Sequence, residues 1–216
     1  MESMVLRNSH LELFMQPTRS RLNVASRLAA VTEAQAGYFT RAQAASHGVA
    51  DFELDRATDY EQVERLDVGV YRLVGAPADS FENLRVAWLR LAPAVSPIDR
   101  IIRPTLWVSH RSAAIVHGFG DFIADRPEFT ATKRLQARID ARITVRRNGL
   151  SRTDWVVREG FAVTSAGRTF ADLVADVVDG GHLGRFAQDA LIGGATHDDL
   201  ADAVDDLDAL LAMAAK

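Results

Sequence analysis

The fold is decided by one stretch, residues 37–74, which reads GYFTRAQAASHGVADFELDRATDYEQVERLDVGVYRLV. Thr40 precedes an Ala-rich run and is followed three residues later by Gln43, which is the spacing of a reciprocal capping box at a helix N-terminus. Gly48 lies just past that run, where helices commonly end in a residue with positive φ. The pattern predicts a short helix over residues 41–46.

A second helix and a hairpin are predicted directly after it. Asp51 can cap a helix in which Leu54 and the apolar residue three positions later lie on one side. Two short β-type runs, residues 63–66 and 70–73, then flank a loop that ends in Gly69, which is typical of a hairpin. Helix, tight turn, helix and hairpin is the order of a winged helix-turn-helix, so the stretch predicts a DNA-binding module with a wing.

Four segments resemble one protein family. They are FTRAQAASHGV at residues 39–49, RLDVGVYRLVGAP at 65–77, LWVSHRSAAIVHG at 106–118 and VTSAGRTFADLV at 163–174. In this order they resemble the AbiEi-type antitoxins of type IV toxin–antitoxin systems, over about residues 28–207. The resemblance implies that the first domain binds operator DNA, and that the second is linked to neutralising a partner nucleotidyltransferase toxin.

The composition is that of an ordinary globular protein, with 48% hydrophobic and 25% charged residues in a chain of 216. No apolar run approaches the roughly 20 residues that a membrane span needs, and the first twenty residues are too charged for a signal-peptide core. We therefore expect a cytoplasmic protein. The chain has no Cys, which excludes disulfides and thiolate metal sites.

Charge is distributed unevenly along the chain. Residues 1–75 carry 8 Lys and Arg against 10 Asp and Glu, residues 76–160 carry 14 against 9, and residues 161–216 carry 3 against 10. A basic middle between two acidic ends indicates either self-association or a charged partner.

The predicted fold class is α+β, with two domains. Residues 1–20 form an N-terminal extension without periodicity, expected to be disordered, and residues 21–77 form the winged helix-turn-helix, with a first helix over residues 21–36. Gly and Pro around residues 75–77 mark the boundary. Residues 80–216 form the second domain, a mixed α/β unit with central strands and closing helices.

In the second domain an amphipathic helix is predicted over residues 81–91, followed by proline residues that end it. Thr169 and Asp172 predict a capped helix with a clean apolar face. The remaining predicted strands are residues 105–108, 129–132, 139–145, 153–157 and 161–163, and the remaining helices are residues 111–117, 182–192 and 196–214.

The candidate DNA contacts are a few donors around the second helix of the winged unit. That helix is acidic, with five carboxylates over residues 51–61 against a lone Arg, which opposes phosphate binding. An alternative is therefore a winged unit that only binds protein. If DNA is bound, the predicted contacts are Thr40 and Arg41 at a helix N-terminus, Arg56 and Tyr60 on the reading face, and Arg65 and Arg72 at the wing.

A basic run in the second domain is the candidate partner surface. Alternation within a strand places Arg142, Thr144 and Arg146 on one face. This face is either a solvated sheet surface or a functional one that binds DNA or complements an acidic toxin active site. The residues predicted for it are Arg134, Arg138, Arg142, Arg146 and Arg147.

No catalytic residue, metal ligand or cofactor is predicted. His110 and His117 are seven residues apart, but neither belongs to a hydrolase or metalloprotease motif, so structural roles are favoured. A nuclease-related enzyme is the weakest alternative. The expected partners are operator DNA with repeats and the toxin, and we expect a monomer in solution or a weak dimer on DNA, with no membrane association.

Overall fold

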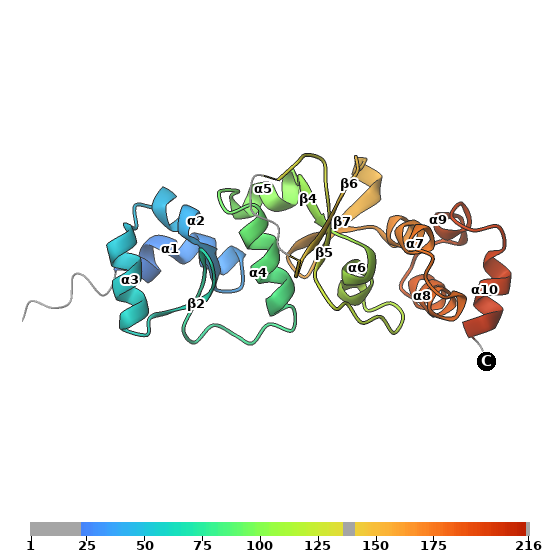
Figure 1. Ribbon diagram of the computed structural model, residues 1–216, viewed down its shortest axis with the longest axis horizontal. Helices are drawn as coiled ribbons and strands as arrows, with labels where there is room; N and C mark the ends of the chain where they lie inside the picture. Colours follow the sequence, from blue (N-terminus) through green and yellow to red (C-terminus); the bar gives the residue numbers. More distant parts are fainter. Residues whose placement is uncertain (1–22, 136–140, 215–216) are drawn as a thin grey trace, which may run out of the picture.

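The computed structural model describes residues 23–135 and 141–214. Three parts follow one another along its long axis: a winged module, a mixed sheet with flanking helices, and a group of C-terminal helices (Figure 1). Residues 1–22, including the predicted extension, lie outside the described part. Among the described residues, no helix is long and apolar enough to cross a membrane.

The winged module consists of three helices and a small antiparallel sheet. Strand β3 is central and pairs with β1 on one side and β2 on the other. A turn at Val68 and Gly69 joins β2 to β3, and Gly69 has the positive φ of 71° that the hairpin requires. The elements are α1 (Asn23–Ala34), β1 (Tyr38–Thr40), α2 (Arg41–Ser46), α3 (Asp51–Asp59), β2 (Val63–Asp67) and β3 (Val70–Leu73).

The core of this module joins all three helices to the sheet. Leu28 of α1 and Leu54 of α3 are fully buried beside Phe39 of β1, and the Phe39 ring stacks on Tyr71 at 5.6 Å between centroids. The predicted capping box is confirmed. The Thr40 hydroxyl accepts a hydrogen bond from the backbone amide of Gln43, and the backbone amide of Thr40 donates to the side-chain oxygen of Gln43. The winged helix-turn-helix predicted from residues 37–74 is therefore present.

Helix α4 (Glu82–Leu91) lies between the winged module and the larger sheet (Figure 1). One of its sides carries Leu89, which is fully buried against Tyr38 and Val70 of the winged module. Another side carries Trp88, whose ring meets Phe161 of the larger sheet edge-on at 5.1 Å. The helix therefore contributes to the cores of both parts.

The larger sheet has the strand order β6-β5-β4-β8-β7. Strands β4 and β5 are antiparallel, as are β7 and β8, whereas β4–β8 and β5–β6 are parallel. Alternating apolar residues of β4, β5 and β8 share one core with α4. The strands are β4 (Leu106–Val108), β5 (Glu128–Ala131), β6 (Thr144–Arg147), β7 (Trp155–Arg158) and β8 (Phe161–Thr164), and the helices inserted among them are α5 (Pro97–Ile102) and α6 (His110–His117).

The C-terminal helices form a separate apolar cluster around Phe170, Leu173, Phe186 and Leu200. Gly184 permits the close approach of two of them, because a Cβ at this position would lie 2.3 Å from the carbonyl oxygen of Leu210. The helices are α7 (Ala166–Ala175), α8 (Gly180–Ile192), α9 (His197–Ala201) and α10 (Leu207–Ala214).

The α+β fold class and most elements are confirmed, and several boundaries are corrected. Helix α7 begins at Ala166, because Ser165 and not Thr169 accepts the capping hydrogen bond. The predicted helix over residues 196–214 is two helices, since Asp206 accepts a hydrogen bond from the amide of Ala209 and starts a new one. Helix α5 was not predicted, although Ser96 caps it and Pro97 occupies its first position. Strand β6 begins at Thr144, later than the predicted residue 139; residues 136–140 are outside the description.

The predicted domain boundary at residues 75–77 stays a prediction, and several contacts cross it. Arg72 of β3 is paired with Glu82 of α4, and the Tyr38 hydroxyl donates to the same carboxylate at 3.1 Å. Arg90 of α4 pairs with Asp67 of β2 at 2.9 Å. Any separation of residues 21–77 from residues 80–216 must break these polar contacts of Glu82 and Arg90. It must also expose Leu89, which packs against the winged module.

Candidate nucleic-acid interface and basic surface

Helix α3 presents an aromatic and charged face to solvent. Leu54 and Ala57 turn inward, whereas the Phe52 side chain is 71% exposed and Tyr60 is 54% exposed. The Arg56 guanidinium lies over the Tyr60 ring, 5.5 Å from its centroid, so these two predicted contacts are neighbours on the outward face. This face is where a recognition helix contacts the major groove.

Arg41 at the start of α2 is paired with two carboxylates of α3. Its guanidinium lies 3.4 Å from Asp51 and 3.3 Å from Asp55, and all three side chains are exposed. Exposed ion pairs contribute little to stability because water screens them, so Arg41 can exchange a carboxylate for a phosphate at little cost. Part of the acidity of α3 is thus compensated within the module, which the charge count along the sequence did not show.

Glu53, a third carboxylate of α3, stabilises the turn between α2 and α3. Glu53 accepts a hydrogen bond from the Ala50 amide at 2.9 Å and pairs with Arg27 of α1 at 2.6 Å. The hydrogen bond from Arg27 lowers the pKa of this carboxyl group below its ordinary value. Arg27 also donates to the carbonyl of Gly48, so it fastens the turn between α2 and α3. Sequence reasoning missed Arg27 because its partners are more than twenty residues away.

Thr40 does not fit its predicted contact with phosphate. The residue is fully buried, its hydroxyl accepts from the Gln43 amide, and it donates to the carbonyl of Pro93 at 2.5 Å. Both hydrogen bonds of the hydroxyl are therefore made within the protein, one in the helix cap and one to the segment after α4. A DNA phosphate cannot reach this hydroxyl while the cap is closed.

The two predicted wing residues differ. Arg65 is exposed on β2, where its Nε lies 3.5 Å from the carbonyl of Asp67. Arg72 is instead held between Glu64, at 2.8 Å, and Glu82, and lies 5.7 Å from the Tyr38 ring centroid. Because both carboxylates already neutralise Arg72, its predicted role as a backbone contact does not fit the structure, whereas Arg65 remains a suitable donor.

Arg146 in the second part is also engaged internally. It lies 2.6 Å from Asp176, which follows α7, and 3.4 Å from Glu128 of β5, which is buried. Arg111 of α6 lies 3.8 Å and 3.7 Å from the same two carboxylates. This group of four residues, the Arg146 network, joins the sheet to α6 and α7, so the prediction of Arg146 as a solvated partner residue is corrected.

The exposed basic residues gather where β5 and β6 end. Ala131 at the end of β5 lies opposite Arg147, and Lys133 and Arg134 lie two and three residues after the end of β5. Lys133, Arg134 and Arg147 are exposed, and within the described residues none of them is paired with a carboxylate. We call these three residues the basic edge. Arg142 is also exposed, just before β6, and Arg138 lies outside the described part.

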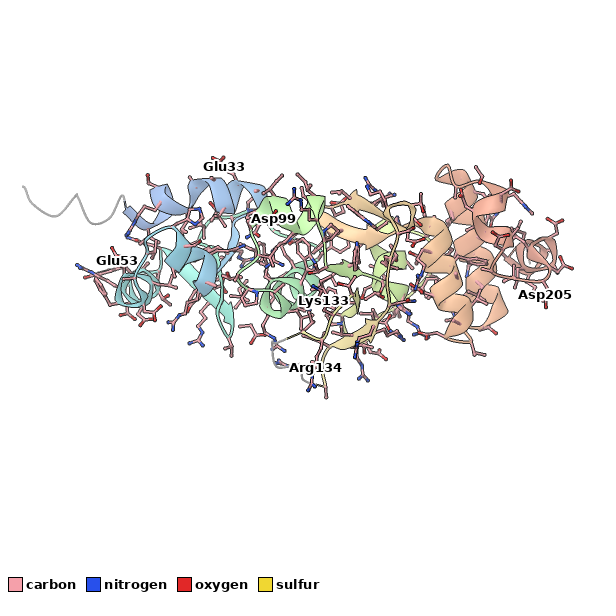
Figure 2. All side chains as sticks on the ribbon, turned by 90° about the horizontal axis from the view of Figure 1, so that it is seen from above. Glu33, Glu53, Asp99, Lys133, Arg134 and Asp205 are labelled. Atoms are coloured by element: carbon pink, nitrogen blue, oxygen red, sulfur yellow. The ribbon has the colours of Figure 1, made fainter. Side chains whose placement is uncertain are left out.

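Figure 2 shows how this charge is separated along the molecule. Lys133 and Arg134 lie in the middle part, whereas Glu33 and Glu53 lie at one end and Asp205 at the other. The basic edge is therefore flanked by acidic parts of the same chain, in agreement with the charge balance along the sequence.

The segments 106–118 and 163–174 meet in one buried polar cluster. His110 has φ +53° and lies 2.9 Å from the Ser109 hydroxyl and 3.8 Å from Asp172, which pairs in turn with Arg168 at 2.8 Å. Burial lowers the pKa of His110, which favours the neutral ring. Both Ser109 and Asp172 contact the same ring nitrogen, so the three do not form a relay from hydroxyl through imidazole to carboxylate.

No group of three or more His, Cys, Asp or Glu side chains suited to a metal ion occurs among residues 23–135 and 141–214. His117, the second histidine considered from the sequence, is buried with its Nε2 2.7 Å from the carbonyl oxygen of Thr164, which connects α6 to β8. Both histidines thus have structural partners.

Comparison with known proteins shows a similar fold over most of the chain and a family match within the winged module. The structure is similar to the crystal structure of the RV2827C protein from Mycobacterium tuberculosis, with a TM-score of 0.50 and 14% sequence identity, over 88% of this chain and 76% of that one. That identity supports a shared fold alone. No curated protein matches the chain. Residues 26–74 match the family described as "Transcriptional regulator, AbiEi antitoxin". The match lies within the winged module, so this part of the chain is similar to the AbiEi antitoxin family of transcriptional regulators.

Proposed function

We propose that this protein is the antitoxin and autorepressor of a type IV toxin–antitoxin pair. The observation that carries the proposal is that residues 26–74, which match the regulator family, coincide with the winged helix-turn-helix. In this proposal the module binds operator DNA and the rest of the chain neutralises a nucleotidyltransferase toxin in the cytoplasm. The protein acts without catalysis, as a monomer in solution that pairs weakly on operator repeats.

DNA binding by this module uses few cations. Arg56 on α3 reads base edges in the major groove, with Tyr60 beside it, while Arg65 on the wing and Arg41 at the start of α2 contact phosphates. About two phosphate contacts per copy correspond to a slope of roughly −2 in log K against log salt. The operator complex is therefore less sensitive to salt than that of a module with a basic recognition helix.

Replacing Arg56 with alanine is expected to weaken operator binding by about 1–3 kcal/mol while leaving binding to random DNA nearly unchanged. Arg65→Ala should weaken both DNAs alike and reduce the salt slope by about one, because a phosphate contact carries no sequence information. Gel-shift titrations with the promoter of the protein's own operon and with random DNA distinguish the two effects, and Arg103→Ala, at an exposed position outside the module, is the control. If the unmodified protein binds promoter DNA no more tightly than random DNA, the proposed repressor role is wrong.

The basic edge is the proposed docking surface for the toxin. A nucleotidyltransferase needs carboxylates to hold its catalytic metal ions, and the exposed cations Lys133, Arg134 and Arg147 complement such a centre. Arg142 is exposed but precedes β6, whereas Arg147 ends this strand, so Arg142 is not part of the basic edge. Arg146 is excluded from this surface by its two internal partners.

The double variant Arg134→Glu with Arg147→Glu should fold normally and rescue growth poorly when the toxin encoded beside it is co-expressed. The matched control reverses two other exposed cations, Arg103→Glu with Arg126→Glu, and should rescue as the unmodified protein does. Thermal melting of both variants verifies folding. If both rescue equally, the toxin docks elsewhere. Loss of rescue on deleting residues 1–79 would assign neutralisation to the winged module instead.

One observation favours a second candidate function, a winged module that binds protein and not DNA. The outward face of α3 carries the exposed ring of Phe52 among Asp51, Asp55 and Asp59, and an exposed aromatic side chain surrounded by carboxylates suits a basic protein surface. In that case Phe52→Ala abolishes toxin binding, and promoter DNA gives no gel shift. The titrations above separate the two candidates directly.

A further inference from the structure

A cavity of about 330 Å³ lies between the winged module and the middle part. Its walls come from α1, α4, α5 and the turn between β7 and β8. They are mostly apolar, with Ala34, Leu89 and Ile101 among them, and the polar groups include Gln35 and Arg100. The volume and the mixture of an apolar wall with a few polar groups are typical of small-molecule sites.

Arg100 is a buried cation without an anionic partner in the described part of the chain. Its side chain is 3% exposed, and no carboxylate of the described residues pairs with it. The guanidinium donates to the carbonyls of Trp88, at 3.3 Å, and Ala92, and lies 5.0 Å from the Trp88 ring centroid. Among the described residues, its Nε has no hydrogen-bond partner. Desolvation lowers the pKa of Arg100 to about 10, which expresses how poorly its charge is compensated.

Arg100 differs from Arg85, the other buried arginine that lines this cavity. Arg85 contributes to the same cavity and is also buried, but it pairs with Asp79 at 2.5 Å and donates to the carbonyl of Glu159 at 3.1 Å. Arg100 receives only the partial negative charge of the carbonyls at the C-terminal end of α4, which stabilise a cation but do not neutralise it. A buried guanidinium without a carboxylate partner favours the binding of an anionic ligand beside it.

We propose that this cavity binds a small organic anion with an apolar body and one carboxylate or sulfonate. The apolar body packs against Leu89, Ile101 and Ala34, and the anionic group pairs with Arg100. Because α1 belongs to the winged module and α5 to the following part, a bound molecule holds the two parts together and raises the melting temperature.

Two fluorescent probes of nearly the same shape test the proposal: 1-anilinonaphthalene-8-sulfonate, and N-phenyl-1-naphthylamine, which lacks the sulfonate. The full-length protein is expected to bind one sulfonate probe per chain, at least tenfold more tightly than the neutral probe. Arg100→Gln should weaken the sulfonate probe about tenfold and leave the neutral probe unchanged. Arg103→Gln, a few residues along at an exposed position, is the control and should change neither.

Two further variants keep the test decisive if Arg100→Gln does not fold, since Arg100 also holds the end of α4. Arg100→Lys retains the charge and should preserve the preference for the sulfonate. Ala34→Trp fills the exposed mouth of the cavity without altering Arg100 and should exclude both probes. Equal affinity of the unmodified protein for the two probes, several sulfonate probes per chain, or full binding by Ala34→Trp would each overturn the proposal.

Discussion

Replacing Arg146 with glutamate is expected to lower the free energy of unfolding by about 3–5 kcal/mol, because the change removes the nearer of the two guanidinium groups that pair with a buried carboxylate. Glu128 is buried and contacts Arg146 at 3.4 Å, while Asp176 lies 2.6 Å from it. A third carboxylate in the same place converts attraction into repulsion, and Arg111, at 3.8 Å from Glu128, is the one remaining cation of the Arg146 network. The sheet should then lose its connection to α6 and α7.

The measurement is urea unfolding of this variant beside Arg147→Glu, which makes the same change in charge at the next residue. Arg147 is exposed and has no carboxylate partner among the described residues, so the expected change is within about 0.5 kcal/mol. Equal stability of the two variants would show that the Arg146 network does not stabilise the fold. Charge reversal at Arg146 is for the same reason a poor probe of toxin docking, because loss of folding would imitate loss of binding.

Replacing Leu89 with alanine is the second change with a large expected effect, about 2–5 kcal/mol. Leu89 is fully buried, and its contacts are Tyr38 and Val70 of the winged module, so the substitution leaves a cavity between α4 and that module. Hydrogen exchange should show the loss of protection first in β1 and β3. The exposed Ile102 is the control, and Ile102→Ala should change stability by less than about 0.5 kcal/mol.

The same residue tests the proposed domain boundary. A fragment of residues 80–216 keeps the core shared by Trp88 and Phe161 but exposes Leu89 to water. We expect this fragment to fold and to become more soluble when Leu89→Gln is introduced. If the fragment does not fold with either residue, the two parts form one cooperative unit and the boundary at residues 75–77 is only a bend in the chain.

Local signals in the sequence determined the winged module. The capping box of Thr40 and Gln43, the positive φ of Gly48 and Gly69, and the paired apolar runs of the hairpin all act within a few residues, and the structure contains each of them. The same holds for the amphipathic helix over residues 81–91, which is α4 almost to the residue. Interactions between near neighbours in a chain do not depend on how distant segments fold, so the sequence alone was sufficient to predict them.

Only the tertiary structure decided which of the predicted site residues are available. Thr40 donates to Pro93, Arg72 pairs with Glu82, and Arg146 pairs with Asp176, so each is consumed by a partner that the sequence does not place beside it. Arg100 shows the converse, because its burial without a carboxylate follows from the packing of α4 and α5. The physical reason is common to all four residues. The sequence specifies the chemical type of each side chain. Whether that side chain can bind DNA, a protein or a ligand depends on its burial and on the partners that folding brings from distant positions.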